Sequence, residues 1–162
     1  MSDSTVTLDL FVTATAILAW LLVIRVDVQR FEIDPIALMA ALLLSIASSL
    51  AFTPEIAILF DRALGGIIGL LAGAFIHRFM PIRFGRGDVW LIGAFWGIAG
   101  TDNIALANLL LLISAAISAW SYSYARGKKP FHSLFPLGLP VGISAIALLV
   151  IDGILILGGF NG

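Results

Sequence analysis

The stretch PIALMAALLLSIASSLAFTP, residues 35–54, carries no charged residue over its whole length. About 20 apolar residues in a helix are enough to cross the hydrocarbon core of a bilayer, where the backbone polar groups must be satisfied within the segment. Comparable uncharged runs cover 103–125 and 130–151. None of these runs shows the alternation that is typical of membrane β-strands. The pattern therefore predicts helices that span a membrane.

The composition of the chain also indicates a membrane environment. Of its 162 residues, 60% are hydrophobic and 12% are charged, with a mean hydropathy of +1.09. A water-soluble domain of this length needs more polar surface. The net charge of −1 argues against a nucleic-acid partner, and the absence of cysteine excludes disulfides and thiolate metal sites. We expect an all-α polytopic membrane protein in which residues 1–162 form one domain within the lipid bilayer.

Six membrane spans are predicted, and basic residues orient them. The first residues, MSDSTVTLDLF at 1–11, lack the positive segment of a secretory signal, so we expect the first span to be retained. The spans cover roughly 8–25, 35–52, 56–77, 88–101, 103–122 and 134–158. Eight of the nine Lys and Arg residues fall in the first, third and fifth connections: Arg25, Arg30, Arg78, Arg83, Arg86, Arg126, Lys128 and Lys129. Positive connections face the cytoplasm, which predicts both termini outside it.

Three charged residues fall inside the outer half of the predicted spans: Asp61, Arg62 and Asp152. Ionisable groups in a membrane are costly and tend to pair in the interior of a helix bundle. We therefore expect Arg62 to contact Asp152 or Asp61. A transporter or channel subunit that uses these charges is the alternative function.

Asp27 and Asp88 are predicted at the cytoplasmic ends of the first and fourth spans, and therefore at the same depth. Two neighbouring carboxyl groups can hydrolyse a peptide bond when one takes a proton from water and the other donates a proton to the carbonyl oxygen. Such a pair shares a proton. Asp88 begins a helix and Asp27 ends one, so the helix dipoles favour Asp88 as the base and Asp27 as the acid.

Glycines mark two further features of the sequence. Gly85 and Gly87 stand just before Asp88, where they could expose backbone for an extended substrate, or could simply form the loop before a helix that an acidic residue begins. The glycines Gly65, Gly69, Gly73, Gly93 and Gly97 recur every four residues and predict close helix packing. We expect this packing to lie within the chain, bringing the fourth span against the first. A dimer interface is the alternative, and the oligomeric state stays open.

The sequence around both aspartates resembles one family. GRGD at 85–88, followed by VWLIGAFWGIAG, is similar to the GxGD signature of the type IV prepilin peptidases. DVQRFEIDP at 27–35 is similar to the family's first aspartate segment, GGIIGLLAG at 65–73 to its glycine-rich third helix, and PFHSLFPLGLP at 130–140 to the start of its last helix. By this resemblance Asp27 and Asp88 match the two catalytic aspartates.

The resemblance implies a function and a location. It implies the short, peptidase-only form that serves Flp-type tight-adherence pili, an enzyme of the bacterial inner membrane that needs no metal or cofactor. Its substrate would be a prepilin or pseudopilin, cleaved where a basic leader meets an apolar helix at the cytoplasmic face. The chain departs from the family in Trp90, which replaces a lysine, in Ile33-Asp34-Pro35, and in His132-Ser133. A non-catalytic pilus-assembly homologue is therefore a further alternative. The spacing of His77 and His132 indicates interfacial polar residues rather than metal ligands.

Overall fold

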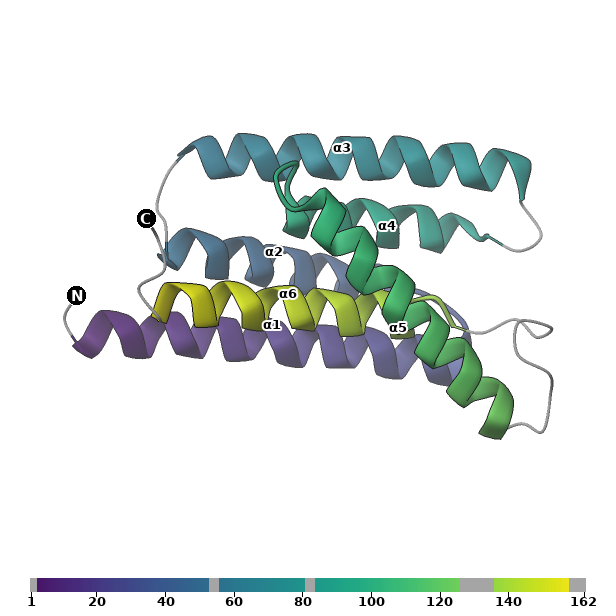
Figure 1. The fold of residues 1–162 in the computed structure, drawn as a ribbon, viewed down its shortest axis with the longest axis horizontal. Coiled ribbons are helices and arrows are strands. Elements are labelled where there is room, and N and C mark those ends of the chain that lie inside the picture. Colours follow the sequence, from purple (N-terminus) through teal and green to yellow (C-terminus); the bar gives the residue numbers. More distant parts are fainter. Residues whose placement is uncertain (1–2, 53–55, 81–83, 126–135, 158–162) are drawn as a thin grey trace.

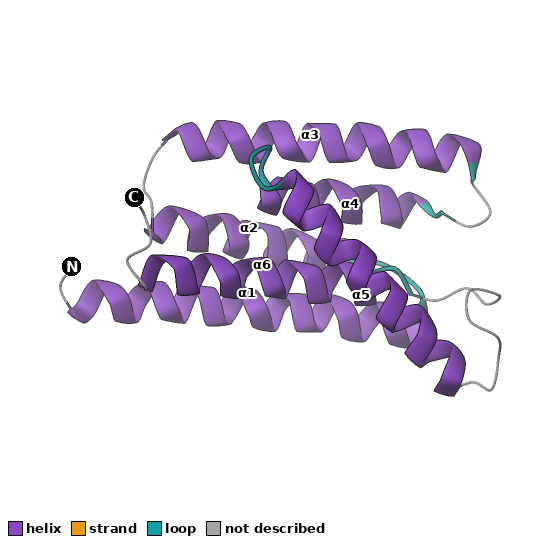
Figure 2. Cartoon of the chain, in the orientation of Figure 1, coloured by secondary structure: helices purple, strands orange, loops and turns teal. Residues whose placement is uncertain are grey.

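The protein is described from a computed structural model that places residues 3–52, 56–80, 84–125 and 136–157. All regular structure in these residues is α-helical, in agreement with the predicted fold class (Figure 2). The six helices are α1 (Asp3–Arg30), α2 (Pro35–Phe52), α3 (Ile56–Phe79), α4 (Arg86–Ala99), α5 (Ile104–Ala125) and α6 (Gly138–Leu157).

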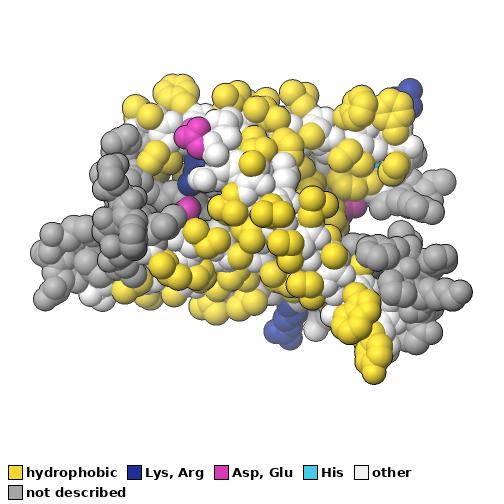
Figure 3. Space-filling model, in the orientation of Figure 1, with side chains coloured by type: hydrophobic (Ala, Val, Ile, Leu, Met, Phe, Trp, Pro, Cys, Tyr) yellow, Lys and Arg dark blue, Asp and Glu magenta, His cyan; other side chains and the backbone are white. Residues whose placement is uncertain are grey.

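Three of these helices have the length and hydropathy to cross a membrane. They contain the segments Thr7–Arg30, Ile56–Phe79 and Ile104–Ala125, while α2 and α6 contribute the shorter apolar stretches Pro35–Ala51 and Gly138–Ile154. Hydrophobic side chains cover most of the described surface in the view of Figure 3. Large apolar side chains such as Phe11 and Leu71 are about two-thirds exposed. A surface of this kind indicates a membrane protein.

Several helices extend beyond the predicted spans. The first was predicted to end at residue 25, but α1 continues to Arg30 and stops at Phe31, whose φ is 55°. Arg25 and Arg30 therefore lie in a helix, and so do Arg78 in α3 and Arg86 in α4. The prediction was wrong because it followed the apolar run, whereas a helix continues into polar residues until a backbone feature ends it. The other predicted cytoplasmic cations lie outside the described residues.

The start of α2 agrees with its sequence signal. The backbone N–H groups of Ile36 and Ala37 donate to Asp34 Oδ1 at 2.9 and 3.3 Å. Pro35 occupies the first helical position, where the missing N–H costs nothing. The predicted N-cap is confirmed, and it fixes the short connection between α1 and α2 at one end of the bundle.

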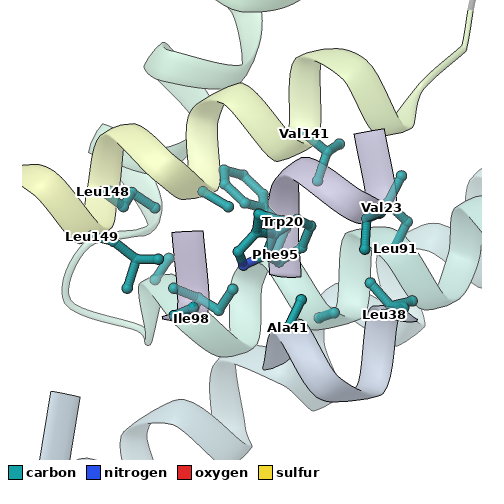
Figure 4. Close-up of a cluster of buried hydrophobic side chains, with 14 of the residues drawn as sticks. Trp20, Val23, Leu38, Ala41, Leu91, Phe95, Ile98, Val141, Leu148 and Leu149 are labelled. Carbon is teal, nitrogen blue, oxygen red and sulfur yellow. The ribbon is translucent and has the colours of Figure 1, made fainter. Parts of the chain in front are cut away.

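The helix α4 lies at the centre of the bundle. Figure 1 shows α3 along one side of it, α1, α2 and α6 on the other, and α5 crossing obliquely. Eight of its fourteen residues are buried: Leu91, Ile92, Gly93, Ala94, Phe95, Gly97, Ile98 and Ala99. Phe95 and Trp20 of α1 are fully buried in one core cluster (Figure 4), and Trp20 Nε1 donates to Ser45 Oγ at 3.1 Å. An α-helix that is apolar on all sides needs such a position.

The predicted glycine packing within the chain is confirmed, but between different helices. A Cβ atom at Gly65 would lie 2.5 Å from the Trp96 carbonyl oxygen, and one at Gly69 would lie 2.9 Å from that of Ile92. Gly73 likewise faces Val89, and a Cβ at Gly93 would meet the Leu70 side chain at 2.6 Å. These contacts join α3 to α4. The expectation that Gly93 draws α4 against α1 was wrong, because the small residues of α4 face the complementary glycines of α3.

Arg62 is paired with one of the two acids that the sequence suggested. Arg62 Nη2 lies 3.7 Å from Asp152 Oδ2 and donates to Ser49 Oγ at 3.4 Å. Asp61 instead accepts hydrogen bonds from the backbone N–H and the hydroxyl of Thr101, in the turn after α4. Arg62 therefore joins α3 to α6, while Asp61 holds the turn between α4 and α5.

The Arg62–Asp152 pair gives a testable prediction. We expect Arg62→Ala or Asp152→Ala to lower the free energy of unfolding by about 2 kcal/mol, between the values of exposed and fully buried pairs. The swapped protein, with Arg62→Asp and Asp152→Arg together, should recover part of this loss. Thermal unfolding in detergent micelles measures the effect. A double variant no more stable than the two single variants would contradict a direct interaction.

Candidate active site

The helices bring Asp27 and Asp88 to the same end of the bundle. Val23 of α1 and Leu91 of α4 belong to one buried cluster, in which Figure 4 labels both. Asp27 follows Val23 by one turn and Asp88 precedes Leu91 by about one turn. Because the two helices run in opposite directions, as Figure 1 shows, both steps lead to the same end. There the charge of Asp88 acts on the Asp27 carboxyl group.

Asp27 is buried against the start of the last helix. Asp27 is only 4% exposed, and the backbone N–H of Gly138 donates to its Oδ2 at 2.5 Å. Gly138 is the first residue of α6, and a Cβ there would lie 2.6 Å from Oδ2. The site therefore requires glycine at this position. Gly138 was not among the predicted site residues, although it lies at the start of the last apolar segment, two residues before Pro140.

The hydrogen bond from Gly138 to Asp27 bears on which of the two acids is the base. The sequence placed Asp27 at a helix C-terminus and Asp88 at a helix N-terminus. In the structure Asp27 also meets a helix N-terminus, that of α6, whose free N–H groups favour an anion. Helix dipoles therefore no longer distinguish the acid from the base.

One carboxylate oxygen of Asp88 accepts a hydrogen bond at the start of α4, and the other makes no hydrogen bond to the described residues. It is half-buried in the first turn of α4, and its Oδ2 accepts the backbone N–H of Gly85 at 2.7 Å. Gly85 is the N-cap residue, with φ −75° and ψ 168°. Among the described residues, Oδ1 of Asp88 makes no hydrogen bond. Asp88 thus has the structural role that the sequence left open, that of an acid at the start of a helix. Its second oxygen remains available for proton transfer.

The two glycines before Asp88 have different roles. Gly85 has extended backbone, as an exposed edge requires. Gly87 lies within α4, so the expectation that it forms part of an open edge was wrong, because the helix already begins at Arg86. A Cβ at Gly87 would lie 3.1 Å from Ile33 Cβ. Gly87 therefore permits close packing of α4 against the connection between α1 and α2.

His77 lies next to this site, which its sequence position did not indicate. Its Nδ1 is 2.5 Å from the carbonyl oxygen of Phe84, the residue before Gly85, and its charge acts on Asp88. His77 thus links the last turn of α3 to the segment that carries Asp88. No motif spacing joins positions 77 and 84, so only the fold could reveal the contact. His132 lies outside the described residues.

A groove of about 630 Å³ leads to the same end of the bundle. It lies between α2, α3 and α4, and it extends from Ile33 and Gly87, beside Asp88, to Arg62 of α3. Trp90 lines the groove and is 62% exposed. Apart from Arg62, the lining residues that the structure describes carry no charge.

Within the described parts of the chain, no three or more His, Asp or Glu side chains gather as metal ligands would. The arrangement instead offers two carboxyl groups, each with one oxygen held by the backbone N–H of a glycine. Comparison of the chain with protein-family models, curated proteins and solved structures finds no match.

Proposed function

We propose that the protein is an aspartic endopeptidase of the bacterial inner membrane that removes the leader peptide of a Flp-type prepilin or pseudopilin at the cytoplasmic face. The observation that carries the proposal is that Asp27 and Asp88 lie at the same end of the bundle, near enough for the charge of Asp88 to act on the Asp27 carboxyl group. A glycine N–H fixes one oxygen of each carboxylate. The resemblance of GRGD and of the Asp27 segment to the prepilin peptidases supplies the substrate class.

The proposed reaction divides two tasks between the acids. One carboxylate takes a proton from water, which attacks the scissile carbonyl carbon, while the other, protonated, donates its proton to the carbonyl oxygen. Asp88 suits the role of base, because its Oδ1 makes no hydrogen bond to the described residues and the groove reaches its neighbour Gly87. Asp27 is the more secluded and suits the role of acid. The pair is expected to share one proton in its active state.

The proposed topology has six spans, with the Asp27 and Asp88 end facing the cytoplasm and both termini on the other side. The cations Arg25, Arg30, Arg78 and Arg86 all lie near this end, which supports the orientation. With 14 residues, α4 is about 21 Å long, shorter than a bilayer core of about 30 Å. Its position inside the bundle makes this length acceptable, because protein buries eight of its residues.

A cleavage assay tests the proposal. The purified protein in detergent is incubated with a probe polypeptide that has a lysine-rich leader, a glycine, and an apolar helix of about 20 residues. We expect one cut at the junction of leader and helix, identified by sequencing the new amino terminus of the product. A non-catalytic homologue or a transporter would leave the probe intact. The ion pair and hydrogen bonds of Arg62, Asp61 and Asp152 give no separate support to transport.

Gly138 provides a prediction about positioning. In Gly138→Ala the new methyl group would lie 2.6–2.9 Å from the Asp27 carboxylate and must displace it. We expect kcat for the probe to fall about 10- to 100-fold with little change in KM, because orientation of the acid is lost rather than binding. Gly153→Ala in the same helix is the control, since a Cβ there meets nothing within 4 Å. Equal activity of the two variants would contradict a positioning role.

A further inference from the structure

The groove between α2, α3 and α4 exists because α3 packs on α4 and stands apart from most of α2. The glycines of α3 bring its backbone onto α4, as described above. On the facing side, Met39 of α2 and Ile67 of α3 line the groove and are each 55% exposed. The groove therefore opens sideways toward lipid, as well as toward the end that carries Asp88.

We propose that this groove holds the apolar helix of the substrate, with the end of that helix that carries the scissile bond beside Gly87 and Asp88. The inference rests on the proposed endopeptidase function and adds the surface that binds the substrate. The α4 wall runs from Gly87 to Gly97, which is about 15 Å of helix or half the hydrocarbon core. Small residues on the groove wall, such as Ala63, Gly66 and Ala94, permit close approach of a helix.

The charges of the groove match such an occupant. Arg62, the one charged residue among the described lining residues, is engaged by Asp152, so the interior suits an uncharged helix. At the other end the lining residue Ile33 stands between Glu32 and Asp34, and Gly87 stands between Arg86 and Asp88. Among the described residues that adjoin these two in the chain are three acids, Glu32, Asp34 and Asp88, and one arginine, Arg86. An acidic mouth before an apolar groove complements a substrate whose basic segment precedes an apolar helix.

Photocrosslinking tests the location directly. A benzophenone amino acid is placed at position 67, inside the groove, or at position 64, where Leu64 is 51% exposed outside it. Both proteins also carry Asp88→Asn, so that the lysine-leader probe stays intact. We expect adducts with the apolar helix of the probe from position 67 and several-fold fewer from position 64. Adducts with lipid alone at position 67, in vesicles that contain the probe, would overturn the inference in favour of a lipid site.

Steric and charge variants of the active protein give an independent readout. Ala63→Phe fills the groove, while Ala57→Phe adds the same bulk to an exposed position of α3 outside it. We expect Ala63→Phe to raise KM at least tenfold and Ala57→Phe to leave it unchanged. Glu32→Lys, at an exposed position of the mouth, should raise KM for the lysine leader and not for a glutamine leader.

The outcomes separate this inference from the proposed function. Cleavage that Ala63→Phe does not affect would overturn the groove as the binding surface and leave the endopeptidase intact. Adducts from position 67 without any cleavage by the unmodified protein would overturn the endopeptidase and keep the groove as a helix-binding surface.

Discussion

Asp27→Asn and Asp88→Asn are each expected to lower kcat for the leader-helix probe by about 10³-fold or more. An amide can neither take the proton from water nor share the proton of its partner. Loss of either acid should therefore remove the mechanism rather than weaken it. The double variant should be little worse than the single ones, because residues that act as one unit are not additive. Initial rates of product formation, followed by gel or mass spectrometry, measure the effect.

Asp9→Asn is the matched control for Asp27→Asn. Asp9 lies in the same helix and is 5% exposed, against 4% for Asp27, but it precedes Asp27 by five turns of α1. We expect its substitution to leave kcat within a factor of about two. Circular dichroism and gel filtration should show that all variants remain folded. Cleavage at the unmodified rate by either active-site variant would refute the proposed pair.

The second large effect concerns the contact between α3 and α4. In Gly69→Ala the added Cβ would lie 2.9 Å from the backbone oxygen of Ile92 and from Trp96 Cβ. A backbone atom cannot move aside as a flexible side chain can, so the two helices must separate. We expect the free energy of unfolding to fall by about 1–3 kcal/mol, as for other overpacked cores. Thermal unfolding in detergent micelles measures the change.

Gly66→Ala offers the same substitution three residues earlier in α3. Its Cβ would lie 3.6 Å from the Gly93 carbonyl oxygen, which is ordinary van der Waals contact. We expect unchanged or slightly raised stability, because alanine favours the helix over glycine. A similar loss in both variants would mean that the spacing of α3 and α4 does not depend on Gly69.

The sequence was sufficient for features that depend on residues near one another in the chain. The uncharged run at 35–54 and its counterparts predicted helices, because a membrane helix must satisfy its backbone polar groups within itself. Asp34 and Pro35 predicted the start of α2, and the hydrogen bonds of Asp34 confirm it. The cost of charge in a membrane predicted a partner for Arg62, though not which of two acids it would be.

Only the tertiary structure decided which distant groups meet. It paired Asp27 with the N–H of Gly138, 111 residues away, and turned Gly93 toward α3 rather than α1. It also opened the groove beside Asp88. Helix formation follows from local hydrogen bonding and apolar length, which the order of residues specifies. The position of each helix depends instead on side-chain volumes from the whole bundle, and no short stretch of this sequence contains that information.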